Sequence, residues 1–288
     1  MKHAYLIIAH NEFGILRKLI ELLDCENNAL YIHIDKKVRG FDFEDYRKHA
    51  KKASIVFVTR IKVNWGAFSQ IRCELLLLKE AVRDEHDYYH LISGCDLPLK
   101  SNEYIDNFFA DNNGKLFLAS SGKIFEGEFY DRVRYYHFFQ ELCGNQRKII
   151  AKVFRYFRKR LIRLQKCLKI NRAKKNGLVV HVGSNWFSIP HAFAKFVCEK
   201  EEFIEGNFKY THCGDELFLQ ALASQSGFRS SLTNNNCRYI DWKRGGPYVF
   251  RKEDYPALMA SDKLWARKFS ETIDPDIVND IFETLLQR

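Results

Sequence analysis

The 288-residue sequence has few of the residues that mark disordered or fibrous proteins, with only 5 prolines and 15 glycines. These counts exclude a collagen-like chain or a flexible linker. A hydrophobic content of 46% excludes intrinsic disorder, because it supplies enough apolar surface for a core. No run of about 18 apolar residues occurs, so no transmembrane helix is predicted. The length fits one large α/β domain or two small ones.

Paired cysteine motifs are also missing. The eight cysteines lie far apart, with no Cys-x-x-Cys, at positions 25, 73, 95, 143, 167, 198, 213 and 237. The apolar run at residues 4–9 is too short for a signal peptide and is not followed by a small-residue cleavage site. Together these features predict reduced thiols and a cytoplasmic protein, with a peripheral position on the inner face of the membrane left open.

Acidic residues are absent from one long segment. Residues 147–175 contain 13 Lys or Arg and no Asp or Glu, whereas the other 33 basic residues are balanced by 36 acidic ones. The net charge of +10 therefore arises in this segment. Its apolar residues recur every three or four positions, which predicts an amphipathic helix with a basic polar face.

Three interpretations of the basic segment stay open. The helix could pack on the protein body by its apolar face, or it could lie on an anionic membrane. It could also be a nucleic-acid-binding arm. A basic run gives affinity for phosphates, but no base-reading module accompanies it, so nucleic acid is disfavoured as a partner.

The first 120 residues alternate between strand and helix patterns. Apolar, β-branched runs predict strands at 4–9, 30–34, 55–58, 88–92 and 115–119, with helices at 13–23, 43–52, 68–83 and 103–109. This alternation predicts an α/β fold with a parallel, doubly wound sheet and helices on both faces. Ligands bind such sheets beyond the carboxyl ends of the strands. Here those ends carry the polar stretches 9–11, 34–37 and 93–96.

The second half is more mixed. It predicts strands at 178–181 and 186–189 and helices at 192–201 and 216–224. A terminal helix is expected after Asp274-Pro275, which supplies an N-cap and a first-turn proline. No internal repeat or linker is visible. We therefore expect a single domain over residues 1–288, with the basic helix inserted at 147–175.

Several common catalytic motifs are missing, among them a P-loop, a G-x-S-x-G elbow, an H-E-x-x-H helix, a Cys/His zinc pattern and a G-x-G-x-x-G turn. The candidates that remain are the strand-end residues and the segment 213–218. Gly214-Asp215 predicts the start of a helix with Glu216 in its first turn. A carboxylate there either interacts with the helix dipole or acts as a general base, and both interpretations stay open.

Six motifs in one order resemble the core-2/I-branching glycosyltransferase family, which includes branching β-1,6-N-acetylglucosaminyltransferases and peptide O-xylosyltransferase. The resemblance runs from about residue 4 to residue 275. Its motifs are Trp65-Gly66-Ala67-Phe68-Ser69, His90–Lys100, Gly183-Ser184-Asn185-Trp186-Phe187, Gly214-Asp215-Glu216-Leu217-Phe218, Tyr239-Ile240-Asp241-Trp242 and Trp265-Ala266-Arg267-Lys268-Phe269. The basic segment has no counterpart in it.

The resemblance implies a GT-A-type fold and an inverting transfer from a UDP-sugar without a metal or other cofactor. The D-x-D metal motif is absent, because Ser93-Gly94-Cys95-Asp96 has a single aspartate. We expect N-acetylglucosamine transferred in a β-1,6 linkage, with xylose or glucose as alternatives. The acceptor would be a carbohydrate or a lipid-linked oligosaccharide in surface polysaccharide synthesis. The rivals are a metal-dependent enzyme that uses Asp96 as a ligand, and a non-enzymatic protein that binds lipid or nucleic acid.

The resemblance also implies roles for the groups that carry out the transfer. Glu216 matches the catalytic base, and Asp215 is expected to cap the helix. Lys268 matches the lysine that neutralises the leaving diphosphate. Its arginine partner is expected to be Arg251, with Arg244 as the alternative.

The remaining candidates would bind the substrates. Asp35 matches the position that contacts the uracil or ribose, and His10 ends the first strand nearby, although a buried structural role for His10 stays open. The donor crevice would be lined by Trp65, Gly66 and Asp96. Two aromatic residues are expected on the acceptor side, where an indole can stack on a sugar: Trp186 and Trp242.

Overall fold

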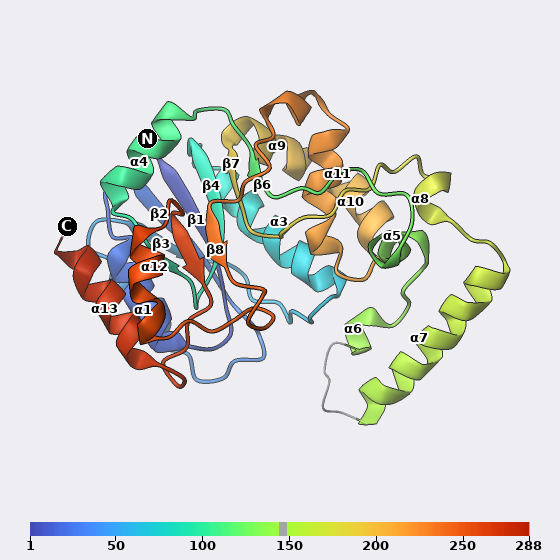
Figure 1. Ribbon diagram of the computed structural model, residues 1–288, viewed down its shortest axis with the longest axis horizontal. Coiled ribbons are helices and arrows are strands. Elements are labelled where there is room, and N and C mark those ends of the chain that lie inside the picture. Colours follow the sequence, from blue (N-terminus) through green and yellow to red (C-terminus); the bar gives the residue numbers. More distant parts are fainter. Residues whose placement is uncertain (144–148, 288) are drawn as a thin grey trace.

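The computed structural model describes residues 1–143 and 149–287. Its centre is a six-stranded sheet in the order β3-β2-β1-β4-β7-β6 (Figure 1). The first four of these strands are mutually parallel, β7 is antiparallel to β4, and β6 is antiparallel to β7. The strands are β1 His3–Ala9, β2 Asn28–Ile34, β3 Ser54–Phe57, β4 Tyr88–Ser93, β6 Phe117–Leu118 and β7 Phe187–Pro190.

Helices cover both faces of this sheet, because its strands are apolar on both sides. In β1, Tyr5 and Ile7 pack into the layer that contains α1 and α4, whereas Leu6 packs into the layer of α3, α9 and α11. The prediction of an α/β fold with a mainly parallel sheet is therefore confirmed. These helices are α1 Phe13–Leu22, α2 Phe43–Arg47, α3 Phe68–Val82, α4 Asn102–Asp111, α9 His191–Glu199, α10 Glu201–Phe208 and α11 Phe218–Ser224.

A smaller sheet in the order β5-β9-β8 joins the C-terminal segment to the body. Its strands are β5 Leu97–Pro98, β8 Arg238–Ile240 and β9 Trp265–Arg267, and the helices α12 Tyr255–Ala260 and α13 Pro275–Leu286 pack beside it against α1. The expected cap of the last helix is confirmed, because the Asp274 carboxylate accepts hydrogen bonds from the backbone N–H groups of Asp276 and Ile277. β9 carries the predicted lysine segment to the edge where β1 and β4 end.

Three predicted elements differ in the structure. The strand at 178–181 is a single bridge between Val180 and Ile124, because its apolar side chains are buried in the core without a neighbouring strand to pair with. The helix at 43–52 ends at Arg47, because the amides of residues 48–50 bond carbonyls three residues back and those of residues 51–53 donate to the Asp24 carboxylate. The helix at 216–224 begins only at Phe218.

The basic segment forms two helices, α7 Ile149–Cys167 and α8 Arg172–Lys175, and it follows α5 Glu128–Arg134 and α6 Gln140–Cys143. Positions 147–148 of the predicted helix lie outside the described residues. In the described part of the chain, no helix is both long and apolar enough to cross a bilayer. The single-domain organisation stays a prediction.

Candidate active site

A cavity of ≈ 770 Å³ lies at the carboxyl ends of β1, β2 and β4, where the strand pattern predicted a ligand crevice. Two indoles stand exposed at its mouth, Trp65 at 62% and Trp242 at 64% of full exposure. Seven of the eleven predicted site residues line the cavity: His10, Asp35, Trp65, Trp186, Glu216, Trp242 and Lys268. The structure places the other four outside the lining: Gly66, Asp96, Arg244 and Arg251.

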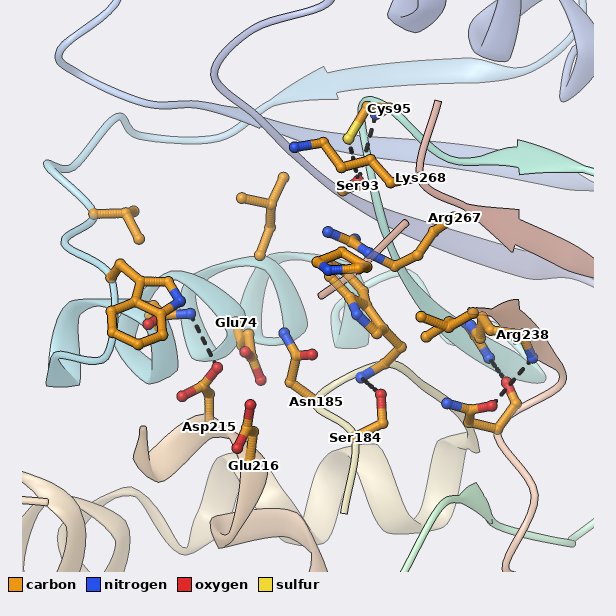
Figure 2. A pocket seen from close by; sticks show the side chains of 18 of the residues that line it. Glu74, Ser93, Cys95, Ser184, Asn185, Asp215, Glu216, Arg238, Arg267 and Lys268 are labelled. Carbon is orange, nitrogen blue, oxygen red and sulfur yellow. Dashed lines mark hydrogen bonds between the residues drawn. The ribbon is translucent and has the colours of Figure 1, made fainter. Parts of the chain in front are cut away.

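One wall of the cavity is cationic. Arg267, at the end of β9, and Lys268, the next residue, both line it (Figure 2). Arg267 stacks on the Trp186 ring with 4.1 Å between its Cζ atom and the ring centroid, which orients the guanidinium. Within the described residues, the Lys268 ammonium forms no ion pair. The positive charge of Lys268 on this wall is therefore not neutralised by any carboxylate in the described chain.

Asp96 lies behind this wall, not on it. It is almost fully buried, and its carboxylate accepts hydrogen bonds from the Ser93 backbone N–H at 2.8 Å and the Ser93 hydroxyl at 2.7 Å. The same carboxylate forms an ion pair with Arg267 at 3.2 Å. Asp96 thus fixes the turn after β4 and holds the arginine in place.

The opposite wall is acidic. Figure 2 places Glu74, Asp215 and Glu216 together across the cavity from Arg267 and Lys268. Glu216 is the last residue of a 3₁₀ turn over Gly214–Glu216, which packs on α3. The expectation that a helix starts at Gly214 with Glu216 in its first turn is therefore confirmed, but this helix is a single 3₁₀ turn, and Leu217, at φ −133°, separates it from α11.

An arginine that the sequence did not single out holds Glu216. Arg132 of α5 donates through Nη1 to Glu216 Oε2 at 2.6 Å, and its guanidinium lies over the Phe129 ring at 4.4 Å. The Glu216 side chain is 36% exposed, so its other oxygen remains accessible from the cavity. A carboxylate with one oxygen fixed and the other accessible is suited to accept a proton from a bound hydroxyl.

Asp215 does not cap a helix as predicted. It is buried, and its Oδ2 atom accepts a hydrogen bond from Gln70 Nε2 at 2.9 Å, because the turn directs it toward α3 instead of α11. Burial raises its pKa to about 7, and the neighbouring charge of Glu216 adds to the shift.

Glu74, one helical turn after Gln70 on α3, is 1% exposed and also lines the cavity. Burial, with the charge of Asp215 adding, raises its pKa well above the usual range. Among residues 1–143 and 149–287, the buried atoms Glu74 Oε2 and Asp215 Oδ1 have no hydrogen-bond partner. Burial therefore favours the protonated form of each of the two acids.

The end of the cavity nearest β2 carries Asp35 and His10. Asp35 accepts hydrogen bonds from the backbone N–H groups of Lys37 at 2.8 Å and Val63 at 3.3 Å, so its orientation is fixed by the loops on either side. His10 is exposed at the mouth, so a buried structural role for it is excluded. Partial desolvation lowers the His10 pKa and the nearby charge of Lys268 lowers it further, while Asp35 opposes the shift.

Gly66 lies outside the cavity lining, where its loop packs closely on the turn that carries Glu216. Its φ of +70° lies in the left-handed region, and a Cβ there would approach Gln140 Nε2 at 3.0 Å and Cys213 Sγ at 3.2 Å. A glycine at this position allows the loop to pass closely over the turn that carries Glu216. The same loop displays the neighbouring Trp65 at the mouth.

The two arginines proposed as partners of Lys268 lie elsewhere. Arg244 forms ion pairs with Asp241 at 2.7 Å and Asp254 at 2.8 Å, and its guanidinium lies over the Tyr248 ring. Arg251 is exposed just before a short 3₁₀ turn and does not reach the cavity lining. Their basic character alone could not reveal which cation faces the cavity.

Three functional candidates escaped the sequence analysis. Arg267 was present in the quoted motif beside Lys268, so its adjacency was a usable signal. Glu74 interrupts the apolar positions of a helix, which is a weaker signal. Arg132 had none, because only the fold brings α5 to the turn that carries Glu216.

A profile of the Core-2/I-Branching enzyme family matches residues 3–261. The chain therefore belongs to this family of glycosyltransferases, as its motifs predicted. The match covers the strand ends, the acidic turn and Trp242, and it ends just before β9.

The curated relatives include Xylosyltransferase 2 of Rattus norvegicus, which is 24% identical over 96% of this chain and 32% of its own length. A xylosyltransferase of Ciona intestinalis is 22% identical over 96% of this chain and 33% of its own length. The chain thus spans about a third of the length of these relatives. The apo crystal structure of mouse xyloside xylosyltransferase 1 aligns over 92% of this chain and 96% of its own, with a TM-score of 0.41 and 10% identity.

Proposed function

We propose that the protein transfers a sugar from a UDP-sugar to a carbohydrate hydroxyl with inversion at the anomeric carbon. The observation that carries this proposal is the polarised cavity. Lys268 and Arg267 form one wall, and Glu216 faces them from the other. A diphosphate on the cationic side and a hydroxyl at the carboxylate would place the donor sugar between them.

In this arrangement the acceptor hydroxyl donates its proton to the free oxygen of Glu216 while its oxygen attacks C1 of the sugar. The bond from C1 to the diphosphate oxygen breaks, and its electron pair leaves with UDP. Lys268 and Arg267 stabilise the negative charge that develops there. A separate acid is unnecessary, because the leaving diphosphate is stabilised by the two cations instead of by a proton.

We propose that the transfer needs no divalent metal. The support is the environment of Asp96, whose carboxylate is already bound by two Ser93 donors and by Arg267. A cation there would have to displace the arginine that faces the diphosphate. Fixed protein cations would instead supply the charge that a metal provides in other transferases.

We propose N-acetylglucosamine as the sugar, in a β-1,6 linkage, following the family resemblance. UDP-xylose is the second candidate, because the relatives reported above are named xylosyltransferases, and UDP-glucose is the third. The acceptor would be a carbohydrate, free or lipid-linked, in surface polysaccharide synthesis, and it would stack on Trp242. A cytoplasmic location stays a prediction.

The test is protection against thermal unfolding by UDP-N-acetylglucosamine, UDP-xylose, UDP-glucose and UDP, because a ligand of the native state raises the melting temperature. GDP-mannose is the control nucleotide sugar. We expect protection by UDP and by one UDP-sugar above the others, unchanged by EDTA, followed by product with that donor and an oligosaccharide acceptor. Equal protection by GDP-mannose, or dependence on a metal, would contradict the proposal.

A further inference from the structure

Helix α7 lies at the edge of the molecule, away from the sheet (Figure 1). One side of it is fixed to the body. Ala151 and Gln165 are buried on that side, and the Gln165 amide bonds both the backbone N–H and the carbonyl of Tyr136, at 2.8 and 3.0 Å. Arg158, also on that side, donates to the side chain of Gln140 in α6. The orientation of the helix is therefore set by contacts with the body.

A second side of the same helix is apolar and uncovered. Apart from the adjacent Tyr156 and Phe157, its residues follow one another at steps of three, four or seven positions, so they form one stripe along the helix. Each is 47–80% exposed: Ile149, Val153, Tyr156, Phe157, Leu164 and Leu168, the last just beyond the helix. We call this set the exposed stripe. Apolar side chains gathered in this way mark an interaction surface.

The flank of the exposed stripe is basic. Lys152, Lys159, Arg160 and Arg163 are all exposed, and residues 149–175 contain no Asp or Glu. Arg160 bonds only the Tyr156 hydroxyl, and none of the four has an ion pair within the described residues. This flank therefore carries uncompensated positive charge next to apolar side chains.

We propose that the exposed stripe and its basic flank dock the protein onto an anionic lipid surface. The helix would lie in the plane of the interface, with Phe157 and Leu164 in the boundary below the headgroups and the basic residues at the lipid phosphates. A membrane satisfies both features at once, because it offers negative charge and an apolar layer. Nucleic acid would satisfy the charge and leave the aliphatic side chains in water.

Helix α7 is linked through Gln140 to the loop that carries Trp65. Gln140, which receives the bond from Arg158, also donates to the Trp65 carbonyl at 3.5 Å, so the helix and the mouth share a contact. Docking itself is independent of the proposed donor chemistry, because protection by UDP would be unchanged if docking failed.

The experiment measures sedimentation of the full chain with vesicles of phosphatidylcholine alone and vesicles containing roughly one third phosphatidylglycerol. One variant replaces Lys152, Lys159, Arg160 and Arg163 with Gln. A matched control replaces four exposed basic residues elsewhere with Gln, and so has the same net charge: Arg39, Lys48, Lys51 and Lys52. A third variant carries Phe157→Ser and Leu164→Ser. Circular dichroism and protection by UDP check that each variant is folded.

We expect wild type and the control to bind the anionic vesicles in a salt-dependent way and to ignore neutral ones. The helix-charge variant should bind on the order of 100-fold more weakly, and the serine variant about 10-fold more weakly. The proposal is overturned if wild type does not bind or if the helix-charge variant binds like its control. It is also overturned if only charge matters and single-stranded RNA displaces wild type from the vesicles, because the surface would then bind polyanions in general.

Discussion

Replacing Glu216 with glutamine keeps the shape of the side chain and removes its capacity to accept a proton. The amide oxygen can still accept the hydrogen bond from Arg132, which is now 2.6 Å from the carboxylate. Because the Glu216 side chain is 36% exposed, loss of this ion pair should change the free energy of unfolding by less than about 1 kcal/mol. The effect should fall on turnover.

General base catalysis contributes roughly 10²–10⁴-fold, or about 3–5 kcal/mol of barrier, and we expect kcat to fall by that factor. The affinity for UDP should stay within about 3-fold, because Glu216 lies across the cavity from the cations that would bind the diphosphate. Transfer kinetics and calorimetric titration with UDP measure the two quantities separately.

Glu141→Gln is the matched control, because this carboxylate binds Ser69 and Asn64 outside the cavity lining. It should affect stability more than turnover. A Glu216→Gln enzyme with kcat within a few-fold of wild type would refute the assignment of Glu216 as the base. A loss of turnover accompanied by loss of UDP binding would point instead to a collapsed cavity.

Further predictions concern the groups around this carboxylate. Lys268→Ala should weaken UDP binding by about 10–100-fold without rescue by Mn²⁺, whereas Arg251→Ala should not, as titration of both variants will check. Arg132→Ala should lower kcat, with Arg132→Lys intermediate, because Arg132 holds one oxygen of Glu216 in place, and an unchanged kcat in Arg132→Ala would contradict this positioning role. The pKa of Asp215 is raised by folding to about 7, so the folded state binds the extra proton and the free energy of unfolding should decrease from about pH 4 to about pH 7. Urea unfolding at a pH below about 5 and at a pH above about 8 measures this decrease. The decrease should be smaller in Asp215→Asn than in wild type, by a few kcal/mol at most, and an equal decrease in both proteins would contradict the pKa shift.

The strands and the crevice could be predicted from the sequence because both follow from local pattern. Runs such as Leu30–Ile34 are apolar throughout since helices cover both sides of the sheet, and parallel strands bring their carboxyl ends to one edge. The polar residues after these strands therefore had to meet, and His10 and Asp35 do line one cavity. The short strands of the second sheet could not be predicted, because a strand of two or three residues is too short to show an alternation of apolar and polar side chains.

Which basic residues line the cavity could not be predicted, because the sequence does not show whether a Lys or Arg side chain pairs with a carboxylate or faces a cavity. Arg244 forms ion pairs with Asp241 and Asp254, both of which lie close to it along the chain. Arg267 is held by Asp96, which is distant in sequence, and by the Trp186 ring. Only the packing of β9 beside β5 decides which arginine faces the cavity.

The acidic wall also depends on contacts between residues that are distant in the sequence. In the sequence, Glu74 lies among the leucines of an amphipathic helix and would be assigned to its solvent face. The 3₁₀ turn beside α3 buries it instead, and Gln70, one turn earlier, reaches Asp215 from the same side of the helix. Burial raises the pKa of both acids, whereas Glu216, the residue after Asp215, is 36% exposed and forms an ion pair with Arg132. Adjacent carboxyl groups in one turn thus lie in different surroundings, and Glu216 is the one that is both held by a cation and exposed in the cavity, as a proton acceptor requires.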